Sequence, residues 1–239
     1  MVVPVIIGAV DLLTQGDMLG LLGVYGYVAC VLVLSHMLRN RLHNPRKLVH
    51  ILTGGIVFFW WLFDTPWIMA GLAAFPFIPI LLLTTPISPV KRLRESSLGE
   101  ISSGGHAYGL VLYAISWTII AFFLFNDLFA ASIAIAAMSF GDGMGELIGR
   151  RYGKHELVPN RTVEGSLAVL CATFIAIIVI GWFYFSVIGY AGGSQPFFMP
   201  VFALGVAAFV TMIEAVTPGK VDNLVIPLVV GGVLHMMGV

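Results

Sequence analysis

Long apolar runs, separated by short charged segments, are the feature that most restricts how this chain can fold. Hydrophobic residues make up 59% of its 239 residues and charged residues only 10%, whereas soluble domains carry about 25% charged residues. Because a helix needs about 20 mostly apolar residues to cross a bilayer, we predict an all-α polytopic membrane protein. It should form one domain over residues 1–239, with about eight transmembrane helices in a single bundle. The candidate spans lie near residues 20–38, 48–63, 67–84, 107–125, 128–140, 166–189, 197–213 and 224–238.

The run 128–140 is the shortest of these spans, and it stops directly at Gly141-Asp142. We interpret this position as a helix that ends or breaks at membrane depth. Membrane proteins tolerate such a backbone only where protein or water covers it. The end of this run is therefore a candidate functional position.

The basic residues all fall on one side of the predicted bundle. With eight spans, the loops on that side hold all twelve Lys and Arg residues, whereas the alternate turns hold Asp64, Asp127 and the segment 190–196. Cytoplasmic loops carry the excess of Lys and Arg in membrane proteins. We therefore predict that the basic face is cytoplasmic and that both termini lie on the opposite side. Because the net charge is zero, the composition gives no sign of a nucleic-acid partner, and none is expected.

The central charged loop combines acids and bases at the mouths of two spans. In Gly141-Asp142-Gly143, glycine can bring the backbone close to a ligand. If a helix starts here, Asp142, Glu146 and Arg150 lie on one face, four residues apart. Mg²⁺ favours one or two carboxylates plus substrate phosphate oxygens, so this face could hold a divalent cation and a phosphate together. The positive charge that a triphosphate needs would come from Arg150, Arg151, Lys154 and Arg161.

That loop also has a simpler interpretation. A positive-inside anchor with a helical ion-pair ladder would account for Arg150, Arg151 and Lys154. It would not account for an acid at each span mouth, Asp142 at one and Glu164 at the next. We therefore favour a site over an anchor.

The last charged loop places Glu214 at the end of one span and Asp222 just before another. Acidic residues at membrane depth are costly and mark functional sites by default. Pro218-Gly219 is a turn signal that would fold the two acids toward each other. Both are candidate catalytic residues, and Asp222 is a second candidate metal ligand. Alternatively, Asp222 only caps the final helix.

Two further loops supply candidates. In the first, Pro45 fits the first turn of a helix, and Arg46, Lys47 and His50 then present cations at the span mouth. His50 is a candidate catalytic residue or a histidine satisfied by a neighbouring helix. In the other loop, residues 91–109, His106 lies at a span entrance.

Four segments together resemble the membrane-bound polyprenol kinase family, which groups phytol kinases, dolichol kinases and a CTP-dependent diacylglycerol kinase. They are "RKLVH" at 46–50, "GDGMGELIGRRYGK" at 141–154, "RTVEGS" at 161–166 and "VDNLVIP" at 221–227. Asn160-Arg161 stands where the family often has two lysines, and Gly145 where it often has alanine. The phosphatidate cytidylyltransferases are more distant relatives with a similar nucleotide segment.

The resemblance implies phosphoryl transfer from CTP to the hydroxyl of an isoprenoid alcohol such as phytol, geranylgeraniol or a dolichol-like polyprenol. It also implies where the nucleotide binds, with Mg²⁺ on Asp142, and it points to further substrate contacts. The nucleotide-binding candidates are Gly141, Gly143, Glu146, Arg150, Lys154, Arg161, Thr162, Glu164 and Gly165, and the other substrate candidates are Lys47, Asn223 and His106.

Two other functions remain as alternatives. A cytidylyltransferase would transfer the nucleotidyl group and form a CDP-lipid. A small ion-coupled transporter would use Asp142, Glu214 and Asp222 to bind an ion along a broken helix. A transporter predicts acids near the midplane, whereas here the acids lie at span ends beside Arg and Lys. This placement favours a phosphate site.

Overall fold

The computed structural model describes residues 13–38, 45–96, 99, 108–190 and 198–239. Apart from one short hairpin, the regular structure of these residues is helical, so the predicted all-α class is confirmed. The helices of the first half are α2 (Gln15–Leu38), α3 (Pro45–Thr53), η1 (Gly54–Leu62), α4 (Pro66–Ile68), η2 (Met69–Ala74), α5 (Phe77–Leu83), α6 (Lys91–Arg94) and α8 (Gly109–Phe123).

The second half continues the bundle and contains the hairpin. Its elements are α9 (Leu128–Ala136), η3 (Ala137–Asp142), α10 (Gly143–Tyr152), β1 (Glu156–Val158), β2 (Arg161–Thr162), α11 (Val163–Gly181), η4 (Trp182–Ile188), α12 (Met199–Val216) and α13 (Asp222–Met236). The two strands pair antiparallel, with Glu156 opposite Thr162. Asn160 in the turn between them has φ 67°, the left-handed region that asparagine tolerates better than most residues.

Five helical segments of the described chain are long and apolar enough to cross a membrane, which makes this a membrane protein. They are Gln15–Leu38, Pro66–Leu83, Leu128–Tyr152, Val163–Ile188 and Met199–Val216. The apolar helices α8 and α13 are shorter, and α3 continues into η1. Every predicted span thus coincides with a helical segment, but the number of eight membrane crossings stays a prediction.

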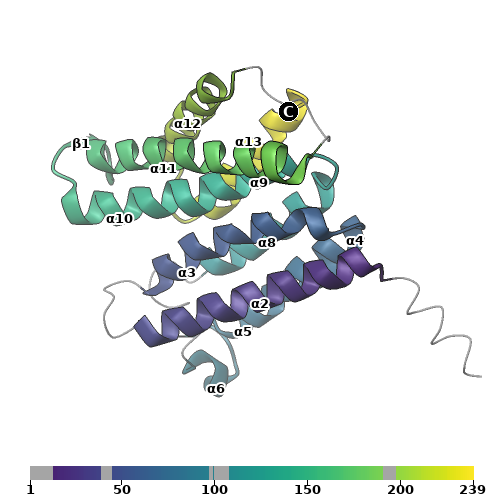
Figure 1. Cartoon of the computed structure of the whole chain (residues 1–239). Helices are drawn as coiled ribbons and strands as arrows, with labels where there is room; N and C mark the ends of the chain where they lie inside the picture. The colour runs from purple at the N-terminus through teal and green to yellow at the C-terminus, as the bar shows by residue number, and fades with distance from the viewer. Residues whose placement is uncertain (1–12, 39–44, 97–98, 100–107, 191–197) are drawn as a thin grey trace, which may run out of the picture.

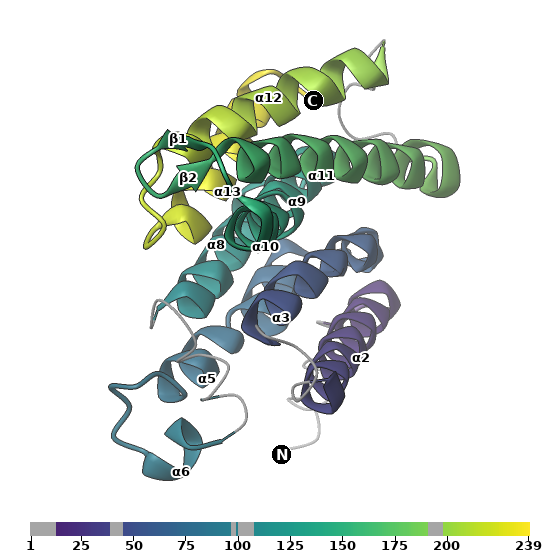
Figure 2. The ribbon, with the colours of Figure 1, turned by 90° about the vertical axis from the view of Figure 1, so that its left-hand side faces the viewer.

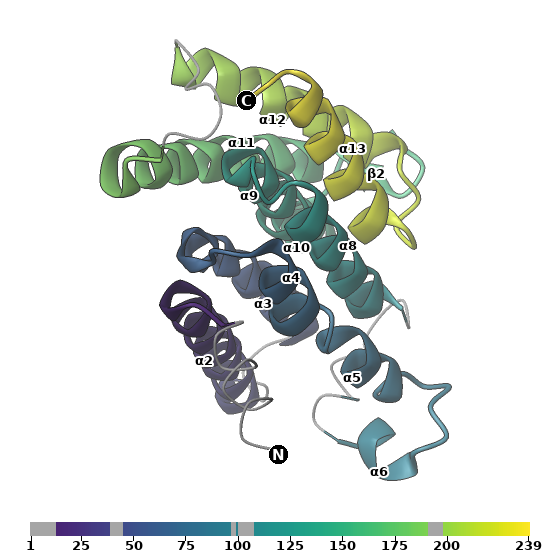
Figure 3. The same ribbon diagram turned by 90° about the vertical axis from the view of Figure 1, so that its right-hand side faces the viewer.

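The helix that contains Asp142 is the centre of the bundle. In the most apolar stretch of the segment Leu128–Tyr152, 89% of the residues are buried within the protein, whereas the corresponding share in the other four segments is 22–39%. Figures 1 and 3 show α9 and α10 between two groups of helices, with α2, α5 and α6 on one side and α11, α12 and α13 on the other. α11 packs against both α10 and α12, and α13 packs against α8 and α9.

The predicted end of a helix at Gly141-Asp142 is wrong. The chain passes from α9 through η3, a π-helical segment, directly into α10. A π segment widens the helix by one residue per turn and is frequent at functional sites. The irregularity predicted at this position is therefore real, but it is a local widening inside a continuous helix.

The glycines of this helix serve close packing against its neighbours. A Cβ at Gly145 would lie 2.4 Å from Val169 Cγ2, and one at Gly143 would lie 2.4 Å from Ile51 Cγ1. Glycine at these positions therefore lets α11 and α3 approach the helix backbone. The contact of Gly141 and Gly143 with a ligand stays a prediction, and a Cβ at either position would meet a neighbouring helix, at Thr173 and Ile51 respectively.

The predicted orientation in the membrane can be tested with single cysteines. Cys30 and Cys171 are free and exposed, so both are first replaced by serine. We expect Leu157→Cys, in the exposed hairpin, to react with an impermeant thiol reagent only when the cytoplasmic face is accessible. Asn126→Cys, in the exposed turn between α8 and α9, should react only from the opposite side. Labelling of both from the same side would contradict the eight-span topology.

Candidate functional site

Lys47 joins α3 to the central helix through two ion pairs. Its Nζ lies 2.9 Å from Asp142 Oδ2 and 2.6 Å from Glu146 Oε2. Burial alone would lower the pKa of this ammonium, but the charges of the two carboxylates outweigh burial and raise the pKa. Lys47 is therefore a buried cation that holds two acids, one helical turn apart, in fixed positions.

Asp142 keeps one oxygen without a partner. Its Oδ2 accepts a hydrogen bond from Lys47, whereas Oδ1 is buried and has no hydrogen-bond partner among the described residues. Nearly all buried polar atoms in folded proteins are hydrogen-bonded, so an exception calls for an explanation such as a missing ion or water. An oxygen that is buried, anionic and unpaired is the kind of ligand that Mg²⁺ takes.

His50 packs on the other side of Asp142. Its Nε2 lies 3.0 Å from the carbonyl oxygen of Met138 and 3.7 Å from Asp142 Oδ2. Because a carbonyl only accepts hydrogen bonds, this contact assigns the proton to Nε2 and leaves Nδ1 as an acceptor in the neutral ring. The ring meets Tyr113 edge-on, with 5.1 Å between centroids. The buried ring is thus held by contacts from both η3 and α8.

A second cluster forms around Arg161. Its Nη1 lies 2.6 Å from Glu214 Oε1, its Nη2 lies 4.0 Å from Asp222 Oδ2, and Nη2 also donates to the carbonyl oxygen of Thr217. The hairpin therefore contacts the end of α12 and the start of α13, as Figure 2 shows. The expectation that Pro218-Gly219 turns the two acids toward each other is confirmed, with Arg161 between them.

The two clusters lie within electrostatic range of each other. Asp142 interacts with Arg161, and Glu214 with both Asp142 and Lys47. At the start of α13, before its apolar part, burial and the charge of Asp142 raise the pKa of the Asp222 carboxyl to about 7. Carboxylates that repel each other in this way favour binding of a cation.

Asn223 and Arg46 complete this side of the site at the start of α8. Asn223 Nδ2 donates to the carbonyl oxygen of Gly109 over 2.8 Å, while its Oδ1 is buried and lacks a partner in the described part of the chain. A Cβ at Gly109 would lie 2.0 Å from Arg46 Nη2, so the glycine makes room for that guanidinium. Arg46 was not among the predicted site residues, although "RKLVH" contains it.

The basic rim of the site is exposed. Arg150 Nη2 pairs with Glu146 Oε1 at 2.8 Å, and 72% of the Arg150 side chain is accessible. Lys154 follows at the exposed end of α10. Basic side chains in contact with solvent can turn toward an incoming polyphosphate, whereas Lys47 and Arg161 are already engaged with acids.

Three predicted nucleotide ligands, Thr162, Glu164 and Gly165, hold the hairpin in place. Glu164 accepts hydrogen bonds from the backbone of Lys154 and His155, and its Oε1 lies 2.7 Å from His155 Nδ1. The Thr162 hydroxyl caps α11 by accepting from the Gly165 amide. These contacts position Lys154, and they show a partner for His155 that sequence spacing did not reveal.

Not every predicted site residue can be placed. His106 lies outside the described residues. No group of three or more His, Cys, Asp or Glu residues arranged to hold a metal occurs among those that are described. A cation on Asp142 would therefore need oxygens from substrate and water, which is how Mg²⁺ usually binds with nucleotides.

Comparison with known proteins decides the family. No family model and no solved structure matches the chain. The phytol kinase of Synechocystis sp. is 30% identical over 217 residues, which cover 84% of each chain. The chain belongs to the phytol kinase family. Another member, phytol kinase 1 of Arabidopsis thaliana, described as chloroplastic, is 28% identical over 193 residues, or 77% of this chain and 62% of its own. The predicted family and enzyme class, a phosphotransferase with an alcohol acceptor, are confirmed.

Proposed function

We propose that this protein transfers the terminal phosphate of CTP to the hydroxyl of an isoprenoid alcohol at the membrane surface. Family membership supports the lipid-alcohol acceptor. The observation that carries the site is Asp142, whose Oδ2 is fixed by Lys47 while its buried Oδ1 is unpaired. Exposed Arg150 and Lys154, further along α10 and just beyond its end, are the proposed ligands for a polyphosphate.

Asp142 and Asp222 are the residues that would hold Mg²⁺, which supplies charge neutralisation for the terminal phosphates. Lys47, Arg150, Lys154 and Arg161 supply the remaining positive charge around the transferred group. Glu146 sets the direction of both Lys47 and Arg150, because each of its two oxygens pairs with one of them.

In the reaction, the alcohol oxygen forms a bond to the terminal phosphorus of CTP, and the bond from that phosphorus to the bridging oxygen breaks to release CDP. The hydroxyl proton goes to a base, for which His50, Glu214 and, if it holds no Mg²⁺, Asp222 are the candidates. Glu214 already pairs with Arg161 at 2.6 Å, so a proton transferred to Glu214 would weaken that ion pair. A positioned base contributes roughly 100- to 10,000-fold to such a step.

The proposed active site faces the cytoplasm, because its residues are linked by ion pairs to Lys47 and Arg161, which belong to the predicted basic side. The alcohol would reach them from the bilayer, since a long prenyl chain does not leave it. In this arrangement the acids gather on one side of the bundle, beside arginine and lysine. A phosphate site requires acids beside basic residues in this way, whereas an ion pathway requires acids near the membrane midplane.

The donor and the bond that is broken are tested with labelled CTP. Membranes from an expressing host are incubated with phytol, geranylgeraniol or a longer polyprenol, and with CTP labelled either at the terminal or at the alpha phosphate. We expect only terminal label to enter the lipid, and unlabelled CTP to compete better than ATP or GTP. Entry of alpha label would show a cytidylyltransferase, and no transfer to any lipid would contradict the kinase and favour the transporter. Membranes from a host with an empty vector are the control.

A further inference from the structure

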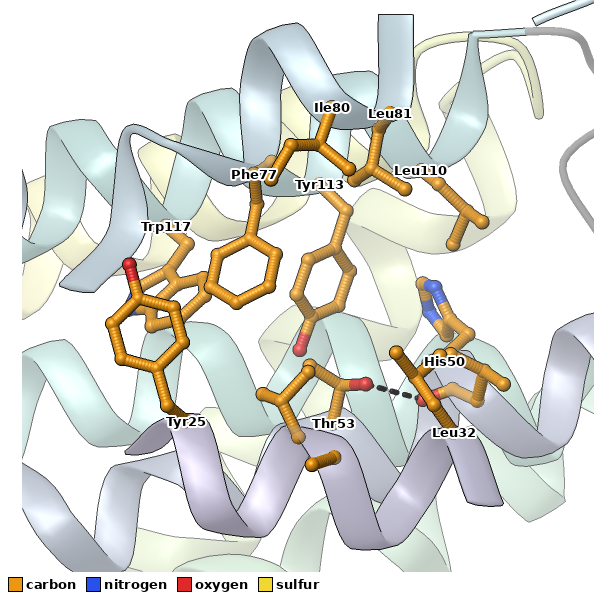
Figure 4. A pocket seen from close by; sticks show the side chains of 14 residues that line it. Tyr25, Leu32, His50, Thr53, Phe77, Ile80, Leu81, Leu110, Tyr113 and Trp117 are labelled. Carbon is orange, nitrogen blue, oxygen red and sulfur yellow. Dashed lines mark hydrogen bonds between the residues drawn. The ribbon is translucent and has the colours of Figure 1, made fainter. Parts of the chain in front are cut away.

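A cavity of about 330 Å³ lies between α2, α3, α5 and α8. Figure 4 shows it extending from Tyr25 and Trp117 at one end to His50 at the other, with Phe77 and Tyr113 between them. Most of its walls are aliphatic and aromatic side chains. The proposed catalytic chemistry uses only His50 from this lining, so the cavity itself has no assigned role.

The hydroxyl groups in the walls are already hydrogen-bonded to the protein, whereas Trp117 Nε1 has no hydrogen-bond partner among the described residues. The Tyr25 hydroxyl donates to the carbonyl oxygen of Leu72, the Thr53 hydroxyl donates to that of Val49, and the Tyr113 hydroxyl bonds to Ser139 Oγ. These hydroxyls are therefore not presented to a ligand. An apolar pocket with few polar groups selects an apolar occupant.

One end of the cavity reaches the charged site. His50 lines the cavity and at the same time lies 3.7 Å from Asp142, through Nε2. Its Nε2 is occupied by the carbonyl oxygen of Met138, so Nδ1 is the ring nitrogen left to accept from a hydroxyl. A molecule with an apolar body in the cavity and a hydroxyl at His50 Nδ1 would have only the imidazole ring between that hydroxyl and Asp142.

The other boundary of the cavity opens outward between α2 and α5. Tyr25 on α2 is 41% exposed and Ile80 on α5 is 48% exposed, and Ala29 on α2 is exposed as well. Both helices belong to segments that are long and apolar enough to cross a membrane. The exposed part of the lining therefore faces the bilayer, so a lipid can enter sideways.

We propose that this cavity binds the hydroxyl-proximal part of a single-chain isoprenoid alcohol that enters from the bilayer between α2 and α5. The inference rests on the proposed function and assigns the pocket that holds the substrate of that site. The volume is about twice the ~150 Å³ of an apolar cavity that holds benzene, which leaves room for roughly a dozen carbon atoms, or two to three isoprene units. The rest of the tail lies in the lipid.

Selectivity follows from this arrangement. Only the first isoprene units contact the protein, so alcohols of the length of phytol or longer are bound alike. A diacylglycerol carries two chains beside its hydroxyl, and both would have to fit next to His50. The cavity therefore favours single-chain alcohols and discriminates little by total length.

The test uses Ala29→Phe, which fills the mouth of the cavity from an exposed position on α2. The matched control is Cys30→Phe, which adds the same ring at the next residue, exposed and outside the lining. We expect Ala29→Phe to raise the KM for phytol and geranylgeraniol at least about tenfold, the loss of roughly one large side chain of apolar contact. The KM for CTP should stay unchanged, and Cys30→Phe should behave like the parent.

A second measurement does not depend on turnover. Geranylgeraniol that carries a diazirine near its hydroxyl should label peptides of α2, α3, α5 or α8 in the parent and in Cys30→Phe, and label them weakly in Ala29→Phe. Labelling confined to other helices would overturn the proposal. If the parent transfers phosphate, two kinetic results would also overturn the proposal. One is an unchanged KM for phytol in Ala29→Phe, and the other is phosphorylation of diacylglycerol by the parent as efficient as that of phytol. If the parent labels in the cavity but phosphorylates no lipid, the proposed function fails while the cavity assignment stands.

Discussion

Asp142→Asn is expected to lower phosphate transfer by at least two orders of magnitude, while the protein still folds and inserts. A divalent cation contributes several kcal/mol of charge stabilisation in the transition state, so losing its ligand costs roughly 100-fold or more. The asparagine amide has one oxygen and one NH₂ group. Lys47 Nζ, which donates to Oδ2, would hold the amide oxygen. The NH₂ group would then occupy the position of the unpaired Oδ1, where it offers hydrogen atoms in place of a cation ligand.

The measurement is turnover with CTP and phytol over a range of Mg²⁺ concentrations. Asp127→Asn is the matched control, since Asp127 is an acid at the start of α9 and contacts His235 in the last turn of α13, at the opposite end of that helix from Asp222. We expect Asp127→Asn to retain most of the parent's turnover. Elution on size exclusion and thermal unfolding in detergent show whether each variant is folded. Parent-like turnover of Asp142→Asn at ordinary Mg²⁺ would remove Asp142 from the site.

The helices of this protein could be predicted from the sequence because each apolar run is long and ends at charge, proline or glycine. All eight predicted runs coincide with helical segments, and α3 begins at Pro45 as expected. The continuity of the central helix could not be predicted. Gly141-Asp142-Gly143 resembles a break in the apolar pattern, and packing against α3, α11, α12 and α13 keeps a helix with two glycines and an acid intact.

The site was predictable as a set of loops but not as a set of contacts. Sequence spacing placed Asp142, Glu146 and Arg150 on one face, and the pair Glu146–Arg150 follows from it directly. The bridge from Lys47 to Asp142 spans 95 residues of chain, and the cavity beside His50 is built from four helices. Such contacts depend on how helices pack, which no local pattern encodes. The contact of His155 with Glu164 is local by comparison, because the β1–β2 hairpin turns the chain back between them.

Arg161→Gln is the second substitution with a large expected effect, and its structural role must be separated from phosphate binding. The Glu214 side chain is only 3% exposed and pairs with Arg161 at 2.6 Å. Removing one partner of a buried ion pair costs about 3–5 kcal/mol. We therefore expect Arg161→Gln to lose stability and at least about tenfold in turnover. Arg161→Lys keeps the charge that neutralises Glu214 and should recover most of both.

The variant Arg161→Gln/Glu214→Gln separates the two roles, because it removes the buried carboxylate together with the guanidinium. The comparison is between this double variant and Glu214→Gln alone, so that any catalytic role of Glu214 cancels. If Arg161 binds phosphate, the double variant unfolds at a temperature close to that of Glu214→Gln yet turns over at least about tenfold more slowly. This follows because a hydrogen bond to a charged group is worth roughly 1.5–3 kcal/mol. If Arg161 only neutralises Glu214, the two variants share both unfolding temperature and turnover. That outcome would leave Arg150 and Lys154 as the basic residues that receive the nucleotide.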